Sequence, residues 1–116
     1  ECRAPSHDDP HSAFLMVVAL LSIELHIPHA QSLKDKRAVV RSVRDRLRNL
    51  DLSAKEVALQ DLHQRARMAV AFVALDNAAA DSVLEKVREL VESVPDAMLT
   101  GWTSEKLDFD ETAPLT

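Results

Sequence analysis

The chain has 116 residues, of which 47% are hydrophobic and 28% are charged. This length suits a single domain, and this composition lies near the globular average, which excludes wholesale disorder, collagen and low-complexity fibres. Phosphate-binding loops and dinucleotide-binding motifs need several glycines, so the single glycine, Gly101, excludes both classes. The single cysteine, Cys2, can form neither an internal disulfide nor a cysteine-rich zinc site, and we expect a cytoplasmic protein.

The two ends of the chain differ in composition from its middle. Residues 1–13 contain two prolines and few apolar side chains, so we expect a flexible tail there, and a second, acidic tail over residues 108–116. Residues 14–107 would form the single domain. Met16 is a candidate for the natural start, which would make the residues before it an extension. The longest apolar run, Phe14 to Leu21, is far shorter than the roughly 20 residues that span a bilayer, so we predict no membrane segment.

The first predicted element is a strand. Apolar residues alternate with polar ones at Leu21, Ile23, Leu25 and Ile27. This period of two is typical of a strand with one buried face. The preceding residues, Leu15 to Leu20, are apolar on both faces, so we expect something to cover the second face there.

A helix should follow Pro28. Ser32, with Asp35 three residues later, resembles a capping box and indicates where the helix begins. Its predicted buried stripe follows helical spacing and consists of Val40, Val43, Leu47 and Leu50.

Two strands, a second helix and a last strand complete the pattern. A short polar strand fits Ala54 to Gln60, and a more apolar one fits Ala66 to Leu75, with Met68, Val70 and Phe72 facing the core. A helix capped by Asp76 or Asn77 runs to Val94, before Pro95. Its buried stripe is Val83, Val87, Leu90, Val91 and Val94. The last strand fits Met98 to Leu107.

This order predicts an α+β fold, the ferredoxin-like βαββαβ sandwich. Its four-stranded antiparallel sheet carries both helices on one face, and its first and third strands are central. Those two strands are the most apolar runs of the chain. The second and fourth carry charges, as edge strands should: Lys55, Glu56, Glu105 and Lys106. A helical bundle is the alternative, and the alternation in the first strand disfavours it.

A net charge of −5 discourages nucleic-acid binding, but the charge is unevenly distributed. The segment from Lys34 to Arg48 holds seven basic and two acidic residues, a local charge of +5. Five of these cations recur three and four residues apart on one side of the predicted helix: Lys34, Arg37, Arg41, Arg44 and Arg48. This basic stripe is about 21 Å long, comparable with several phosphates of a nucleic acid. Ser32 and the free N–H groups of the first turn favour anions at one end.

Two interpretations of the basic stripe remain open. It binds a polyanion, or it is solvated or paired with a matching acidic stripe on the second helix: Asp81, Glu85, Glu89 and Glu92. Aromatic residues make up 3% of the chain, and Phe72 and Trp102 do not form a stacking platform. Any RNA would therefore be contacted through its phosphates and shape.

A second polar cluster lies at the predicted turn before the third strand. It consists of Gln60, Asp61, His63, Gln64 and Arg65. These side chains could transfer protons or hold an anion, but no nucleophile is close in sequence. The usual role of such residues is to form hydrogen bonds with backbone groups of the turn. We predict no catalytic residue, no cofactor and no small-molecule substrate. His7, Asp8, Asp9 and His11 have metal-binding side chains, but a tail offers no preformed geometry, so no metal site is predicted.

Three runs of residues point to a family. The runs Ile23 to Pro28, Ser32 to Arg37 and Gln60 to Ala66 resemble the small bacterial YlxP-like proteins, domain of unknown function 503, over about Met16 to Leu107. The resemblance implies a ferredoxin-like fold and no established activity. Genes of this family often lie near those for translation initiation and ribosome maturation.

This chain departs from the family pattern at three positions. Family members often have a glycine and a polar residue where this chain has Ala58 and Leu59, and often tryptophan at the position of His63.

Three functions follow as hypotheses. The leading one is a non-enzymatic accessory protein that binds structured RNA or the ribosome through the basic stripe. The second is a self-associating module, a homodimer without nucleic-acid binding. The third is a small-molecule enzyme or regulatory domain that uses the cluster from Gln60 to Arg65.

Overall fold

The computed structural model describes residues 15–110, which form six elements. They are β1 (Leu15–His26), α1 (Leu33–Arg48), β2 (Ser53–Ala58), β3 (Arg65–Ala74), α2 (Asn77–Glu92) and β4 (Met98–Asp110). The tail expected over residues 1–13 lies outside the described residues. Within the described part of the chain, neither helix is long and apolar enough to cross a membrane.

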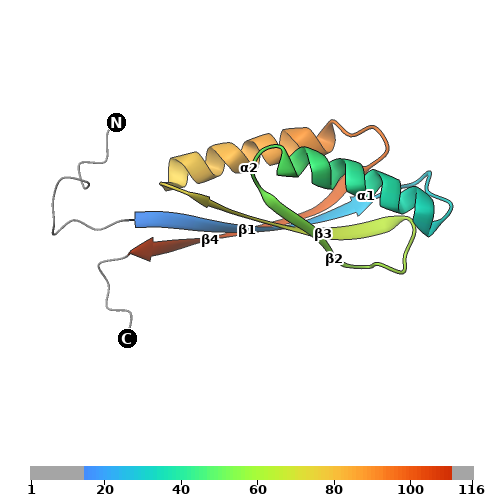
Figure 1. The fold of residues 1–116 in the computed structure, drawn as a ribbon, viewed down its shortest axis with the longest axis horizontal. Helices are drawn as coiled ribbons and strands as arrows, with labels where there is room; N and C mark the ends of the chain where they lie inside the picture. Colours follow the sequence, from blue (N-terminus) through green and yellow to red (C-terminus); the bar gives the residue numbers. More distant parts are fainter. Residues whose placement is uncertain (1–14, 111–116) are drawn as a thin grey trace.

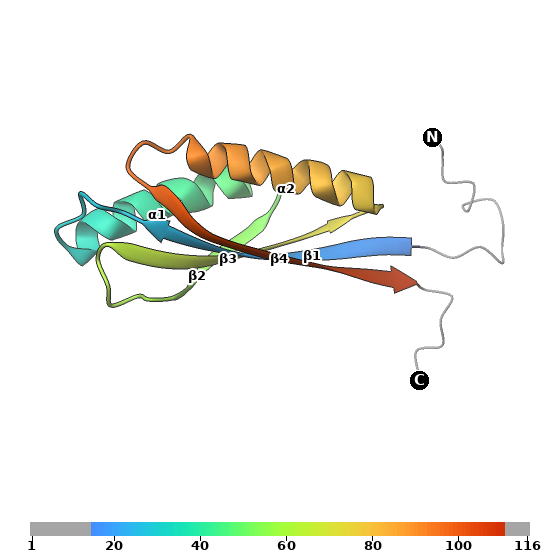
Figure 2. The ribbon, with the colours of Figure 1, turned by 180° about the vertical axis from the view of Figure 1, so that it is seen from behind.

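The four strands form one antiparallel sheet in the order β2-β3-β1-β4. Both helices cover the same face, α1 on the β2 side and α2 on the β4 side (Figures 1 and 2). The opposite face carries no helix, and we call it the open face. This arrangement is the ferredoxin-like sandwich, so the predicted fold is confirmed and the helical-bundle alternative is wrong.

The core lies between the sheet and the helices. Along β1, alternate side chains from Val17 to Leu25 are buried against the helices, and the same alternation runs along β3 from Ala66 to Ala74. Because the two central strands pair over ten residues, their buried side chains form one continuous layer. Burying this apolar layer provides the main driving force for folding.

Side-chain caps fix where the helices begin. The Ser32 hydroxyl accepts a hydrogen bond from the Asp35 N–H (3.1 Å), and the Asp35 carboxylate accepts one from the Gln31 N–H (3.0 Å). At α2 the Asp76 carboxylate accepts from the Ala79 N–H (2.7 Å). Each bond satisfies an N–H group that has no partner within the helix.

The predicted stripe of α1 is wrong at its last member. Val40, Val43 and Leu47 are buried, but the helix ends at Arg48 and Leu50 is exposed. After Arg48 the chain tightens, because the Leu50 N–H donates to the carbonyl oxygen of Leu47 (3.0 Å), three residues back, and the chain then turns at Asp51, whose φ is 65°.

The last strand is longer than predicted. β4 ends at Asp110 instead of Leu107, and its final residues pair with the start of β1, Leu15 with Asp110 and Met16 with Phe109. Residues 108–110, expected in the acidic tail, therefore belong to the sheet. Pairing with β1 satisfies their backbone groups, which a composition-based argument does not consider.

Candidate nucleic-acid interface

The basic stripe lies on one side of α1, with most of its charges in solvent. Lys34, Arg37, Arg41 and Arg48 are exposed. Arg44 differs, because it is half-buried and its Nε lies 3.7 Å from Asp45 Oδ1. Four of the five predicted cations are thus available to an external anion.

The direction of the stripe follows from the side of α1 that faces α2. Val39, Ser42 and Arg46 line a small cavity of about 190 Å³ together with Val94 and Pro95, which follow α2. On a helix with 3.6 residues per turn, the residues of the basic stripe lie on the side opposite Val39, Ser42 and Arg46.

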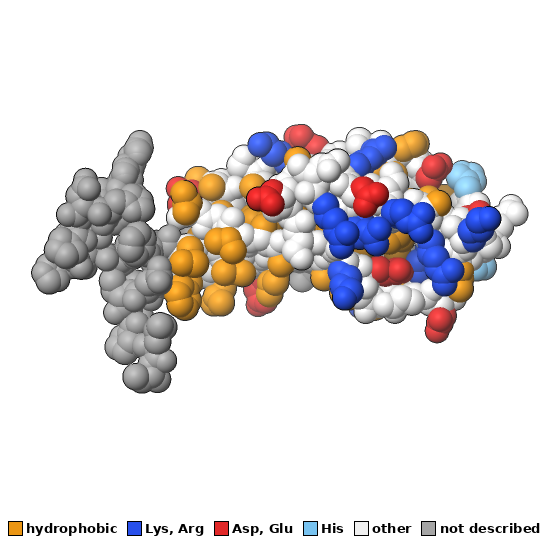
Figure 3. All heavy atoms as spheres, viewed as in Figure 1, with side chains coloured by type: hydrophobic (Ala, Val, Ile, Leu, Met, Phe, Trp, Pro, Cys, Tyr) orange, Lys and Arg blue, Asp and Glu red, His pale blue; other side chains and the backbone are white. Residues whose placement is uncertain are grey.

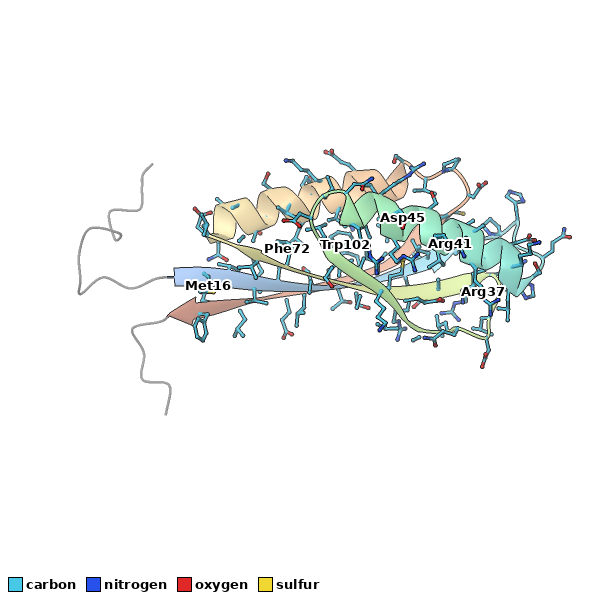
Figure 4. All side chains as sticks on the ribbon, viewed as in Figure 1. Met16, Arg37, Arg41, Asp45, Phe72 and Trp102 are labelled. Carbon is cyan, nitrogen blue, oxygen red and sulfur yellow. The ribbon has the colours of Figure 1, made fainter. Side chains whose placement is uncertain are left out.

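The basic stripe therefore faces away from α2 and lies on the side of β2. We call this surface the α1 flank. Figure 3 shows Lys and Arg side chains forming a band over α1. In Figure 4, Arg37 and Arg41 come from the near side of α1, above β2.

The acidic stripe of α2 does not neutralise the α1 flank. Asp81 pairs instead with Lys106 of β4, at 2.5 Å between Nζ and Oδ1. Between residues 15 and 110, no ion pair joins the basic stripe to Glu85, Glu89 or Glu92. The structure thus separates the two charged stripes that the sequence left as possible partners.

Lys36 is the one basic residue of α1 that is buried, with 1% of its surface exposed. Its ammonium group donates to the carbonyl oxygens of Leu59 (2.6 Å) and Leu62 (2.8 Å) and lies 2.8 Å from Glu56 Oε2. Three polar partners compensate for removing this charge from water. Lys36 therefore joins α1 to β2 and to the turn that follows it.

Lys36 contributes to the local positive charge of the segment from Lys34 to Arg48, and its burial was not predicted. A signal was present, because Lys36 precedes Val40, Val43 and Leu47 at spacings of four, three and four residues. It therefore occupies the first position of the buried stripe.

The cluster from Gln60 to Arg65 does not converge on one point. Gln60, Asp61 and His63 are exposed. Gln64 is used structurally, because its Nε2 donates to the carbonyl oxygens of Pro28 (3.3 Å) and Ala30 (3.2 Å). The structure therefore shows no shared contact among the side chains proposed for proton transfer.

Arg65 instead faces Glu24 on the open face. Its Nε lies 3.1 Å from Glu24 Oε2, and Arg67 Nη2 lies 3.0 Å from Oε1 of the same carboxylate. Hydrogen bonds from Arg65 and then Arg67 lower the pKa of the Glu24 carboxyl below its ordinary value of 4.5. Glu24 thus holds one member of the polar cluster in an ion triad across β1 and β3.

Aromatic side chains give no stacking platform beside the basic stripe. Phe72 is buried, and Trp102 is half-buried with Arg88 over its ring, 4.8 Å from the ring centre (Figure 4). Phe109, expected in a tail, lies on the open face opposite Met16. Contacts at the α1 flank would therefore be made by charge.

Among residues 15–110 no group of three or more His, Cys, Asp or Glu side chains is placed to hold a metal ion. His7, Asp8, Asp9 and His11 lie outside the described residues.

Comparisons with known proteins show the family. The family described as "Protein of unknown function (DUF503)" matches residues 18–103. "Uncharacterized protein YlxP" of Bacillus subtilis (strain 168) is 30% identical over 81 residues, which cover 69% of this chain and 88% of that protein.

A C-terminal segment of the alpha subunit of aIF2 from Pyrococcus abyssi is a similar solved structure. It is 21% identical, with a TM-score of 0.44, and the match covers 79% of this chain and 49% of that one. This chain thus spans about half the length of that structure.

Proposed function

Because the chain belongs to the DUF503 family, whose description names no function, we propose one from the geometry of α1: the protein binds structured RNA through its phosphates. The α1 flank is the binding surface, and the protein acts as an accessory factor without catalysis. The observation that carries the proposal is that four cations of one helical stripe are exposed on the side away from α2.

The spacing of the cations suits a phosphate backbone. Successive members of the stripe lie three or four residues apart, which is about 4.5 or 6 Å along the helix axis. Over about 21 Å such a row can neutralise several phosphates of one strand. The Ser32 cap positions the first turn beside Lys34, where unpaired N–H groups and the helix dipole also favour an anion.

The charge of the whole chain favours one orientation of the protein on an RNA. The net charge is −5, so the surface outside the α1 flank repels a polyanion while the flank attracts it. Phosphate contacts carry no direct sequence information, and binding should follow the shape and charge of the RNA. The gene neighbourhood implied by the family resemblance favours RNA of the translation apparatus as the first probe.

The test is a titration of a fluorescent ribosomal RNA hairpin, followed by anisotropy at several salt concentrations. Four phosphate contacts predict that affinity falls on the order of 100-fold between about 50 and about 200 mM salt. Arg37→Glu with Arg41→Glu should weaken binding at least ~10-fold and reduce the slope against salt by about two.

A matched variant separates the α1 flank from net charge. Arg46→Glu with Lys86→Glu also reverses two exposed cations, but Arg46 lies on the α2 side of the same helix and Lys86 lies on α2. This control should bind the hairpin within ~3-fold of the parent protein at low salt. Equal losses in both double variants, or binding that ignores salt, would contradict the proposal.

A further inference from the structure

The open face of the sheet divides into a polar end and an apolar end. The polar end holds the triad of Glu24, Arg65 and Arg67. At the other end, strand pairing places aliphatic and aromatic side chains side by side: Met16, Val18, Leu20, Val73, Leu107 and Phe109. Leu20 is 53% exposed, Val73 64% and Leu107 65%. Figure 3 shows hydrophobic side chains gathered along the sheet side at this end.

This exposure is unusual for a sheet face in water. Antiparallel sheets with one solvated face normally carry polar side chains on it, whereas Val18, Val73 and Leu107 stand directly across from one another. A contiguous exposed apolar patch marks an interaction surface more often than a single exposed leucine does.

Two residues of opposite charge, Lys55 and Glu105, lie at the two edges of the open face. Lys55 lies on the edge strand β2, and Glu105 lies on the other edge strand, β4. Strands β3 and β1 separate them, about 14 Å at ~4.8 Å per strand spacing, so they cannot pair within one chain. Ser22, Ala69 and Ala71 lie between the two charged residues. All five residues contribute to the lining of a hollow of about 580 Å³.

We propose that a second copy of this chain occupies the open face, stacked sheet to sheet about a two-fold axis parallel to the strands. Such an axis places the β2 edge of each copy over the β4 edge of the other, because the strand order is reversed across it. It also stacks the apolar ends of the two sheets on each other. A two-fold axis perpendicular to the strands would stack the apolar ends on the charged triads instead.

Side-chain sizes and charges fit this arrangement. With β1 of one copy over β3 of the other, Leu20 meets the small Ala71 of the second copy, which is its neighbour in strand register. Lys55 lies over the β4 edge of the second copy. Glu105 of that copy is two residues further along β4, within reach of the Lys55 side chain. Each dimer therefore gains two Lys55–Glu105 pairs that a single chain cannot make.

The available area is sufficient for a stable dimer. The four strands are 12, 6, 10 and 13 residues long, and at about 3.4 Å per residue and ~4.8 Å between strands they give a face of roughly 670 Å². Standard interfaces bury about 800 Å² per partner, with an apolar centre and charged groups at the rim. The open face has its apolar side chains at one end, and Lys55 and Glu105 lie on its two edge strands.

The decisive experiment is a charge swap measured by sedimentation equilibrium of the full chain. Lys55→Glu and Glu105→Lys should each raise the dimer dissociation constant at least ~10-fold, since each creates two like-charged contacts per dimer. The double variant should return to within ~3-fold of the parent. Rescue cannot come from within one chain, because β3 and β1 lie between the two positions.

A second variant tests the apolar end. Val73→Lys places a charge in the proposed interface at a position exposed in the single chain, so folding should be retained, as checked by circular dichroism. It should raise the dissociation constant at least ~10-fold, while Leu50→Lys, at an exposed leucine beyond α1, should leave it unchanged.

Three results would overturn the proposal. They are a parent protein that stays monomeric at ~100 µM, a dimer indifferent to Val73→Lys, and a double swap that fails to rescue. A monomer whose open face is covered by a membrane or by another protein would give the first of these results. None of these outcomes touches the α1 flank, so this inference and the RNA proposal fail independently.

Discussion

Lys36 shows how one buried charge can organise two segments of the chain. Its ammonium group has three hydrogen atoms and three polar partners, the carbonyl oxygens of Leu59 and Leu62 and the carboxylate of Glu56. Without Lys36 these oxygens would lose this shared partner. The residue thus explains why the turn after β2 is ordered against the first turns of α1.

Lys36→Met keeps the length of the side chain and removes its charge. We expect a loss of about 3 kcal/mol in the free energy of unfolding, because two carbonyl groups and a partly buried carboxylate lose their partner. Urea unfolding measures it. Lys34→Met, at an exposed position of the same helix, should change stability by less than about 0.5 kcal/mol. Similar values for the two variants would show that the Lys36 contacts do not stabilise the fold.

Leu59 adopts a backbone conformation that suits glycine. Its φ is 65°, in the left-handed region, where a side chain costs roughly 1–2 kcal/mol. Leu59→Gly should therefore raise the free energy of unfolding by ~0.5 kcal/mol, after allowing for the flexibility that glycine adds to the unfolded chain.

The neighbouring residue provides the control for this prediction. Ala58 ends β2 and does not have a positive φ, so Ala58→Gly should destabilise the protein by roughly 0.5–1 kcal/mol. Opposite signs at adjacent positions are the expected signature in thermal unfolding. If both changes destabilise equally, strain at Leu59 is not significant.

At the scale of elements, the Glu24 triad ties β1 to β3 and makes stability depend on pH. Because the folded-state pKa of Glu24 is lowered, its contribution is present above the ordinary value of 4.5 and is lost as pH falls through the folded pKa. Glu24→Gln should therefore be less stable than the parent at about pH 7, and the difference should narrow as the pH is lowered toward about 3.

Chemical denaturation at these two pH values measures the difference. Glu85→Gln, on an exposed position of α2, controls for removing any carboxylate and should show no such convergence. A gap between parent and Glu24→Gln that persists at low pH would show that the triad contributes through packing instead of charge.

The elements differ in how well sequence predicts them. Alternation in β1 and β3 identifies the central strands, because the pleat turns successive side chains to opposite faces. The start of α1 was readable from Ser32 and Asp35, since a cap is a local interaction. The end of β4 was not, because residues 108–110 are ordered by pairing with β1, which is distant in sequence.

The same distinction applies to the candidate sites. The helical spacing of the basic stripe is a local property and was predictable, whereas its separation from α2 depends on how two helices lie on the sheet. Lys36 and the pairing of Arg65 with Glu24 also join residues distant in sequence. Periodicity narrows the choice for such residues, but only the fold identifies their partners.

The whole molecule has two different surfaces for which we propose binding. The α1 flank is basic and lies above the β2 edge, and the open face is apolar at one end and charged at its rims. In a sheet-to-sheet dimer the helix layers face outward, so two basic flanks would remain accessible at once. A dimer could then hold two RNA segments, or two parts of one, with correspondingly stronger overall binding.

Leu15 pairs with Asp110, so the first and last residues that the structure describes lie together at one end of the sheet. Lys34 and the first turn of α1 lie at the opposite pole, roughly 40 Å away along the 12 residues of β1 at about 3.4 Å each (Figure 1). A fluorophore, a tether or a fused module joined at Leu15 or Asp110 would therefore lie roughly 40 Å from Lys34 and about half as far from Arg48, because α1 runs back toward that end of the sheet. Single-molecule or immobilised assays can use both attachment points without obstructing them.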